Sequence, residues 1–308
     1  MRFPLGLLLP VTLLLTFGWS PPLSGQGAAP AAQYVGSDVC LNCHEASATA
    51  FGKTMMGKTF MAHPRTALEK QGCEGCHGPG SRHAESGGQE QGGMIRFGKG
   101  SKTPVEDQNA VCLQCHEKGA RMFWQASTHE SRDVACTSCH TVMTDVSERS
   151  GLKYSTVLNT CAQCHLQRAS QQRRFSHMPL REGKMECTSC HNPHGTPNDK
   201  LLVASTVNEV CYSCHAEKRG PFLHEHPPVT ENCANCHDSH GSNHEKMLKT
   251  AKPRLCQQCH DPTRHPSRAY AMNDPNVTPV RFIPGRQCAN CHFAIHGSNH
   301  PSGKAFTR

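Results

Sequence analysis

Residues 187–195 read Cys187-Thr-Ser-Cys190-His191-Asn-Pro-His194-Gly195, and the Cys-x-x-Cys-His unit at their start recurs along the whole chain. Ten such units use all 20 cysteines, so no thiol is left over. The cysteine pairs are Cys40/Cys43, Cys73/Cys76, Cys112/Cys115, Cys136/Cys139, Cys161/Cys164, Cys187/Cys190, Cys211/Cys214, Cys233/Cys236, Cys256/Cys259 and Cys288/Cys291. The histidines that follow them are His44, His77, His116, His140, His165, His191, His215, His237, His260 and His292.

The spacing within each unit suits the covalent attachment of a c-type haem. Two cysteines three residues apart can form thioether bonds to the two vinyl groups of one porphyrin, and the next histidine can then ligate the iron. Structural zinc would need a pair of units per ion and gives no reason for a histidine after every second cysteine. Redox-active cysteine pairs do not occur ten to a chain, and the cysteine run of a ferredoxin is absent. The sequence therefore predicts ten covalently bound haem c groups.

The composition is poor in core-forming residues. Only 36% of the 308 residues are hydrophobic with the cysteines included, 6% are aromatic, and 26 glycines and 21 prolines interrupt the chain. Ten haems leave about 31 residues for each, which is enough to wrap a cofactor and little more. We therefore expect a multihaem cytochrome c fold that is mostly coil with short α-helices and negligible β-sheet, arranged as an elongated chain of ten haems.

The first 32 residues have the pattern of a secretory signal peptide. Arg2 precedes an apolar run over residues 5–17, and small residues follow. A membrane anchor is the alternative, but the run is shorter than the ~20 residues that a span needs. We expect residues 1–32 to be cleaved on export, which leaves residues 33–308 as the decahaem region.

The units also form a longer repeat when they are taken two at a time. The first unit of a pair is followed by a downstream histidine, and the second by a histidine a few residues on. The five two-haem repeats cover approximately residues 38–85, 110–145, 159–197, 209–244 and 254–303.

The remaining histidines nearly match the number of iron positions. Of 22 histidines, ten belong to the units, which leaves twelve for ten second axial positions. The predicted second ligands are His63, His83, His129, His177, His194, His226, His240, His265, His296 and His300, with His224 and His244 as spares.

Two of these positions stay open between histidine and methionine. In the first repeat Met56 competes with His63, and in the second Met143 stands where His194 and His240 stand in later repeats. Methionine more often fills gaps in a core than it binds a metal.

Ligands on both faces of every iron would favour electron transfer over catalysis, because no position is left for a substrate. We therefore predict an electron carrier with no catalytic residues. The alternative is a multihaem oxidoreductase that acts on a small nitrogen or sulfur oxyanion, which would need an open iron in the first or second repeat. Two imidazoles also favour a low potential, as anaerobic respiration or ferrous oxidation would require.

The positive charge of the polypeptide does not indicate nucleic-acid binding. The formal charge is +8, or +7 without Arg2, and the propionates of ten haems would make the holoprotein negative. The basic residues are therefore expected to neutralise cofactors.

Three segments resemble the MtrA/DmsE-type periplasmic decahaem c-type cytochromes, and the resemblance extends from about Val39 to Gly303. The segments are Cys73-Glu-Gly-Cys76-His-Gly-Pro-Gly-Ser-Arg-His83, Pro262-Thr-Arg-His265-Pro and Cys288-Ala-Asn-Cys291-His-Phe-Ala-Ile-His296-Gly-Ser-Asn-His300-Pro-Ser-Gly303.

The resemblance implies a periplasmic cytochrome associated with the outer membrane, where it inserts into a β-barrel porin. It implies electron exchange between a periplasmic or inner-membrane donor and an extracellular multihaem cytochrome, mineral or terminal reductase. The family's haems have two histidine ligands, and Met56 and Met143 depart from that pattern.

Overall fold

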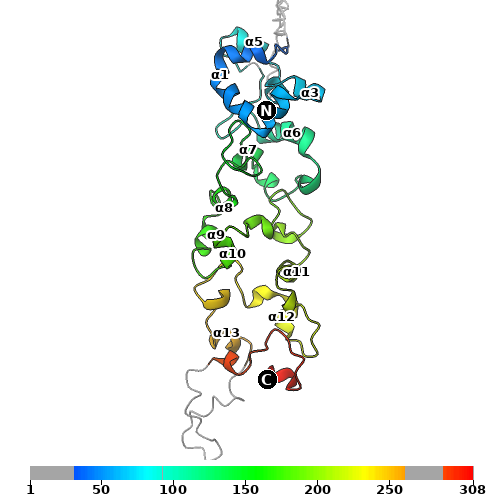
Figure 1. Ribbon diagram of the computed structural model, residues 1–308, viewed down its shortest axis with the longest axis vertical. Helices are drawn as coiled ribbons and strands as arrows, with labels where there is room; N and C mark the ends of the chain where they lie inside the picture. Colours follow the sequence, from blue (N-terminus) through cyan, green and yellow to red (C-terminus); the bar gives the residue numbers. More distant parts are fainter. Residues whose placement is uncertain (1–30, 92, 261–286, 308) are drawn as a thin grey trace, which may run out of the picture.

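The computed structural model describes residues 31–91, 93–260 and 287–307. In this part the molecule is a long, slender body, and the chain advances along it from the helices α1 and α5 at one end to the C-terminus at the other (Figure 1). Segments close in sequence are therefore close along the long axis, as expected of a chain that wraps one cofactor after another.

Most of the α-helices are a single turn or two. They are α1 (Ser37–Lys53), α2 (Met55–Gly57), α3 (Ala67–Lys70), α4 (Glu74–His77), α5 (Ser81–Glu85), α6 (Val105–His116), α7 (Cys136–Cys139), α8 (Val157–Cys161), α9 (Leu166–Gln171), α10 (Met178–Arg181), α11 (Val207–Tyr212), α12 (Pro227–Glu231) and α13 (Arg254–Gln257). The two longest, α1 and α6, each contain a complete Cys-x-x-Cys-His unit, and α1 is kinked at His44.

Other turns of helix lie between these. One is the π-helix η1 (Lys58–Ala62). The 3₁₀ turns are η2 (Gly119–Arg121), η3 (Glu130–Arg132), η4 (Cys187–Ser189), η5 (Asp199–Leu201), η6 (Ala216–Lys218), η7 (Cys233–Asn235), η8 (Glu245–Met247), η11 (Cys288–Asn290) and η12 (Gly303–Ala305).

The described residues form no β-strand, only isolated antiparallel bridges. The bridges are His140↔Leu152, Phe175↔Ser242, His191↔Leu202, His224↔Ser298 and His237↔Leu248. The expected fold class of short helices in a mostly coil chain with negligible sheet is confirmed.

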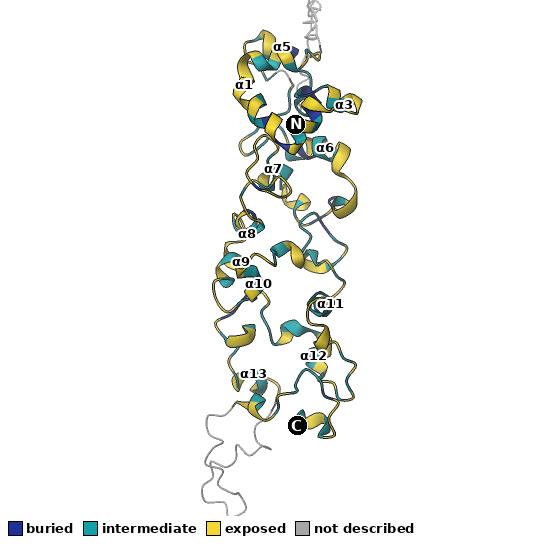
Figure 2. Ribbon diagram, in the orientation of Figure 1, coloured by how far each residue is buried: buried dark blue, intermediate teal, exposed yellow. Residues whose placement is uncertain are grey.

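Side chains alone make almost no core. In the described part the buried hydrophobic residues are Phe51, Phe60, Trp124, Ala135 and Leu248, and no large side chain is completely buried. Exposed and half-buried residues alternate along the whole body (Figure 2). Burial this sparse cannot offset the conformational entropy of so long a chain, so the cofactors must supply the missing apolar contacts.

Within the described ranges, no helix is both long enough and apolar enough to cross a membrane. The predicted signal peptide falls almost entirely in residues 1–30, which lie outside those ranges.

Candidate haem-binding site

Each Cys-x-x-Cys-His unit is a turn of helix. In eight of the units the amide of the histidine donates a hydrogen bond to the carbonyl of the first cysteine, with lengths such as 2.9 Å in His165 and 3.0 Å in His191. The other two units lie inside α1 and α6. Side chains three and four residues apart share one face of a helical turn, so both thiols and the imidazole are presented together.

The first cysteines of paired units lie against each other. The thiol contacts are Cys40 with Cys73, Cys112 with Cys136, Cys161 with Cys187, Cys211 with Cys233, and Cys256 with Cys288. These pairs join the two units of each of the five predicted repeats.

The second cysteines make the connections between repeats. Electrostatic contacts join Cys76 to Cys115, Cys139 to Cys164, Cys190 to Cys214, and Cys236 to Cys259. With the pairs inside the repeats, these contacts place all ten units in one row that follows the sequence.

Cys43 and Cys291 are the second cysteines of the first and last units of the row. Both thiols are exposed, as are those of Cys115, Cys164, Cys214 and Cys259. Cys43 lies in α1 immediately before the kink at His44. The predicted role of Cys43 in haem attachment depends on the Cys40–Cys43–His44 spacing.

Histidines of the units face other histidines at one common distance. Parallel ring pairs are His44–His83 at 6.3 Å between ring centres, His140–His194 at 6.0 Å, His191–His240 at 6.1 Å, His226–His260 at 6.0 Å and His237–His296 at 6.2 Å. The rings of His129 and His165 are 6.2 Å apart and tilted.

This distance fits an iron between two imidazoles. A metal–nitrogen bond is roughly 2 Å long, and each nitrogen lies about 1 Å from its ring centre, which places the two centres about 6 Å apart. The residues present therefore fit haem iron with two axial histidines.

Apart from His44 and His83, which both belong to the first repeat, the pairs join one repeat to another. His140 faces His194 of the following repeat, and His191 faces His240 of the next. His165 is faced by His129 of the preceding repeat, and His177 has the same relation to His215, with which it interacts electrostatically. The sequence predicted these histidines as ligands but did not predict which of them face each other.

The second ring nitrogen of many of these histidines is bound to the backbone. The contacts run from Nδ1 of the histidine to a backbone carbonyl oxygen: His77 to Ile95, His83 to Glu90, His129 to Pro193, His140 to Ser150, His177 to Ser239, His191 to Lys200, His237 to Lys246 and His292 to Ala305. A hydrogen bond from Nδ1 fixes the ring and leaves Nε2 for a metal.

Burial favours the neutral form of five of the candidate second ligands. It lowers the pKa of His194 to about 4 and lowers the pKa values of His177, His226, His240 and His296. Neutral imidazole is the form that ligates iron.

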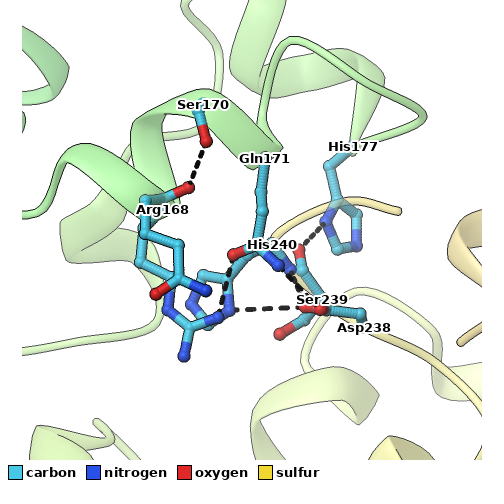
Figure 3. Close-up of polar contacts among 8 residues, drawn as sticks. Arg168, Ser170, Gln171, His177, Asp238, Ser239 and His240 are labelled. Atoms are coloured by element: carbon cyan, nitrogen blue, oxygen red, sulfur yellow. Dashed lines mark hydrogen bonds and ion pairs between the residues drawn. The ribbon is translucent and has the colours of Figure 1, made fainter. Parts of the chain in front are cut away.

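Figure 3 shows how the third and fourth repeats are held together. The side-chain amide of Gln171 donates a 2.9 Å hydrogen bond to the Asp238 carboxylate. The other oxygen of Asp238 accepts a hydrogen bond from the His240 amide at 3.1 Å, and His177 contacts the Ser239 carbonyl at 3.1 Å. Two candidate ligands from different repeats are thus fixed in one cluster.

Sequence reasoning missed a set of positioning residues three places before the first cysteine of some odd-numbered units. Asn109 and Asn208 are buried, and their side-chain Oδ1 atoms accept hydrogen bonds from the backbone amides of Cys136 (2.8 Å) and Cys233 (2.7 Å). Ser37 does the same for Cys73 at 3.1 Å. The shared position, three residues before the unit, was a signal that the sequence already carried.

The structure does not bring every candidate ligand to a partner. His63 is exposed, and no second histidine ring stacks on His77 or His116 in the described part. His300 accepts a hydrogen bond on Nδ1 from the Ser302 amide, and His265 lies outside the described residues.

Comparison with known proteins agrees with this geometry. Residues 177–220 and 226–265 match the doubled CXXCH motif family, and residues 73–164 match the NrfB-like cytochrome c-type proteins. The multihaem cytochrome MtrA of Shewanella baltica is 47% identical over 277 residues, which are 89% of this chain and 81% of MtrA. The chain belongs to the MtrA family of multihaem cytochromes. As such it binds haem c covalently and transfers electrons, and it is a carrier rather than an enzyme.

Shorter relatives match part of the MtrA-like chain. The cytochrome c-type protein NrfB of Escherichia coli is 30% identical over 163 residues, 48% of this chain and 79% of NrfB. NrfB of Haemophilus influenzae is 27% identical over 146 residues, 41% of this chain and 63% of that protein.

Proposed function

We propose that the chain carries ten haems in one row and conducts electrons through a porin–cytochrome complex at the outer membrane. The observation that carries the proposal is the unbroken row of units, in which a thiol of each unit lies near a thiol of the next unit in the sequence. A row of closely spaced redox centres in a slender body is suited to long-range transfer along its axis.

In this proposal every haem is held by the two cysteines of its unit and by the histidine that follows them. The second ligands supported by ring geometry are His83, His129, His194, His226, His240 and His296. His177 is proposed as the second ligand opposite His215, with which it interacts electrostatically. Cys43, His63, His265 and His300 remain proposals from the sequence. The bound haems supply reversible one-electron chemistry, while the protein fixes their order and ligation.

The proposed partners follow from membership of the MtrA family. They are an outer-membrane β-barrel porin, an extracellular multihaem cytochrome or terminal reductase, and a periplasmic or inner-membrane donor. Residues 1–32 would direct export to the periplasm, and residues 33–308 would form the five two-haem repeats.

Reconstitution tests the proposal. The holoprotein is purified with any barrel that stays bound to it, and the complex is placed in liposomes loaded with reduced methyl viologen. We expect an external ferric chelate to oxidise the internal viologen, whereas liposomes with the holoprotein alone stay reduced. A holoprotein that retains no barrel, or a complex that leaves the viologen reduced, would contradict the conduit.

A further inference from the structure

The even-numbered units follow one rule for the residue that faces their histidine. His140 faces His194, which comes three residues after the histidine of the next even unit, and His191 faces His240 at the same offset. His237 faces His296 at an offset of four. The residue that should face His77 of the second unit is therefore the one three places after His140, and that residue is Met143.

The loop that contains Met143 has the scaffold of the loops that contain the facing histidines. His140 bridges to Leu152, as His191 bridges to Leu202 and His237 to Leu248. In all three loops the residue after the bridging leucine donates to the second cysteine of the unit; the donors are the amides of Lys153 (2.8 Å), Val203 (3.0 Å) and Lys249 (2.9 Å). The first of these loops is one residue longer than the other two, and in it Met143 lies at the same offset from the histidine of its unit as His194 and His240 do in theirs.

His77 is prepared for a metal in the same way as its counterparts. Its Nδ1 contacts the Ile95 carbonyl at 2.8 Å, which leaves Nε2 to an iron. The ring packs edge-on against Phe97 at 5.3 Å between centres, and no imidazole stacks on it in the described ranges.

The competing ligand, His63, matches the pattern of the odd-numbered units instead. Each odd unit from the fifth onward is faced by a histidine that lies between the two units of the preceding repeat, as His129 faces His165 and His226 faces His260. His63 lies between the first two units and is therefore expected to face His116, the histidine of the third unit.

Met143 is 38% exposed and is not filling a gap in a core.

We propose that the thioether sulfur of Met143 is the second iron ligand of the haem held by Cys73, Cys76 and His77. This rests on the proposed haem ligation and gives the row one histidine/methionine haem among bis-histidine haems. Methionine ligation raises the potential of a haem, so this haem, near the N-terminal end of the body, is the first to be reduced.

The test is the near-infrared sulfur-to-iron charge-transfer band of the ferric holoprotein, measured with the haem count. We expect the band in the wild type and its loss in Met143→His, with the number of haems unchanged and all of them low-spin. The first reduction step in a spectropotentiometric titration should move to lower potential in this variant. Met56→His is the matched control, because Met56 is the other methionine that could bind iron, and it should keep the band.

Three results would overturn the proposal: a wild type with its full haem count but no band, a band that survives in Met143→His, or a band lost in Met56→His. A low haem count would instead refute the proposed function, because it reports attachment rather than the sixth ligand. If Met143→His does not mature, the wild-type spectrum still decides whether any methionine is bound, and Met143→Leu, which should create one high-spin haem, replaces the variant.

Discussion

At the scale of single residues, the histidines divide into those with a facing ring and those without one. His240 and His244 are four residues apart in the same loop, yet only His240 faces another imidazole, that of His191, at 6.1 Å. Within the described ranges, His244 forms hydrogen bonds through its backbone alone, to the Ser242 hydroxyl. Ring geometry thus distinguishes His240, a candidate ligand, from His244 within one loop.

Replacement of His240 by alanine should open one iron. We expect His240→Ala to convert one haem of the row to a high-spin form that binds carbon monoxide when reduced, because no other imidazole of the described part faces His191. Low-temperature electron paramagnetic resonance of the oxidised protein measures the conversion. The His244→Ala control should stay low-spin throughout; a high-spin signal in the control, or none in His240→Ala, would mean that the ligand has been misassigned.

The buried asparagine Asn208 should contribute to stability in proportion to its hydrogen bonds. Its side chain accepts from the Cys233 amide and donates to the carbonyls of Val229 and Thr230. Removal of buried partners costs about 1–3 kcal/mol, so Asn208→Ala should lower the free energy of unfolding by that amount in a denaturant titration followed by haem absorbance. Exposed Asn159, with one 3.4 Å contact to Ser155, is the control and should change it by less than ~0.5 kcal/mol. Equal losses of stability in the two variants would contradict the role of Asn208 in holding the Cys233 amide.

At the scale of elements, the loops after the sixth, eighth and tenth units need glycine for two reasons. Gly195, Gly241 and Gly297 have φ values of 109°, 115° and 133°, which side chains rarely adopt. A Cβ at Gly195 would also collide with the carbonyl of Phe123 in the preceding repeat. The glycines after His194, His240 and His296 thus allow close approach of a neighbouring segment.

An alanine at Gly195 should therefore cost more than backbone strain alone. We expect Gly195→Ala to reduce the free energy of unfolding by more than ~2 kcal/mol, measured by thermal unfolding. Gly183 also has positive φ but faces open space, so Gly183→Ala should cost about 1 kcal/mol from the left-handed backbone. If the two variants lost the same stability, close approach of the repeats would not be the reason for the glycine.

Features that depend on residues close together in the sequence could be predicted, and features that depend on distant residues could not. The attachment units are fixed by covalent chemistry over five residues, so Cys187, Cys190 and His191 could be assigned directly. Facing pairs such as His140 and His194 could not, because the partner depends on how far the chain advances between repeats. The role of Asn208 depends on a hydrogen bond to a residue 25 positions away, which no local pattern specifies.

At the scale of the whole molecule, the protein lacks a core of its own, so haem attachment and folding should be coupled. Chain produced without haem attachment should show no cooperative thermal transition by circular dichroism and should be digested rapidly by protease. The reason is that five buried hydrophobic side chains in the described part cannot offset the entropy of the chain. A cooperative transition in the haem-free chain would show that side-chain packing suffices.

Conduction along the molecule depends on a row of ten haems, one for each Cys-x-x-Cys-His unit. Its most direct test is the intact mass of the purified, exported protein under denaturing conditions, in which only covalently attached haem is retained. We predict the mass of the chain from about residue 33 onward plus ten haems. A mass that corresponds to fewer haems would contradict the unbroken row and, with it, conduction along the length of the molecule.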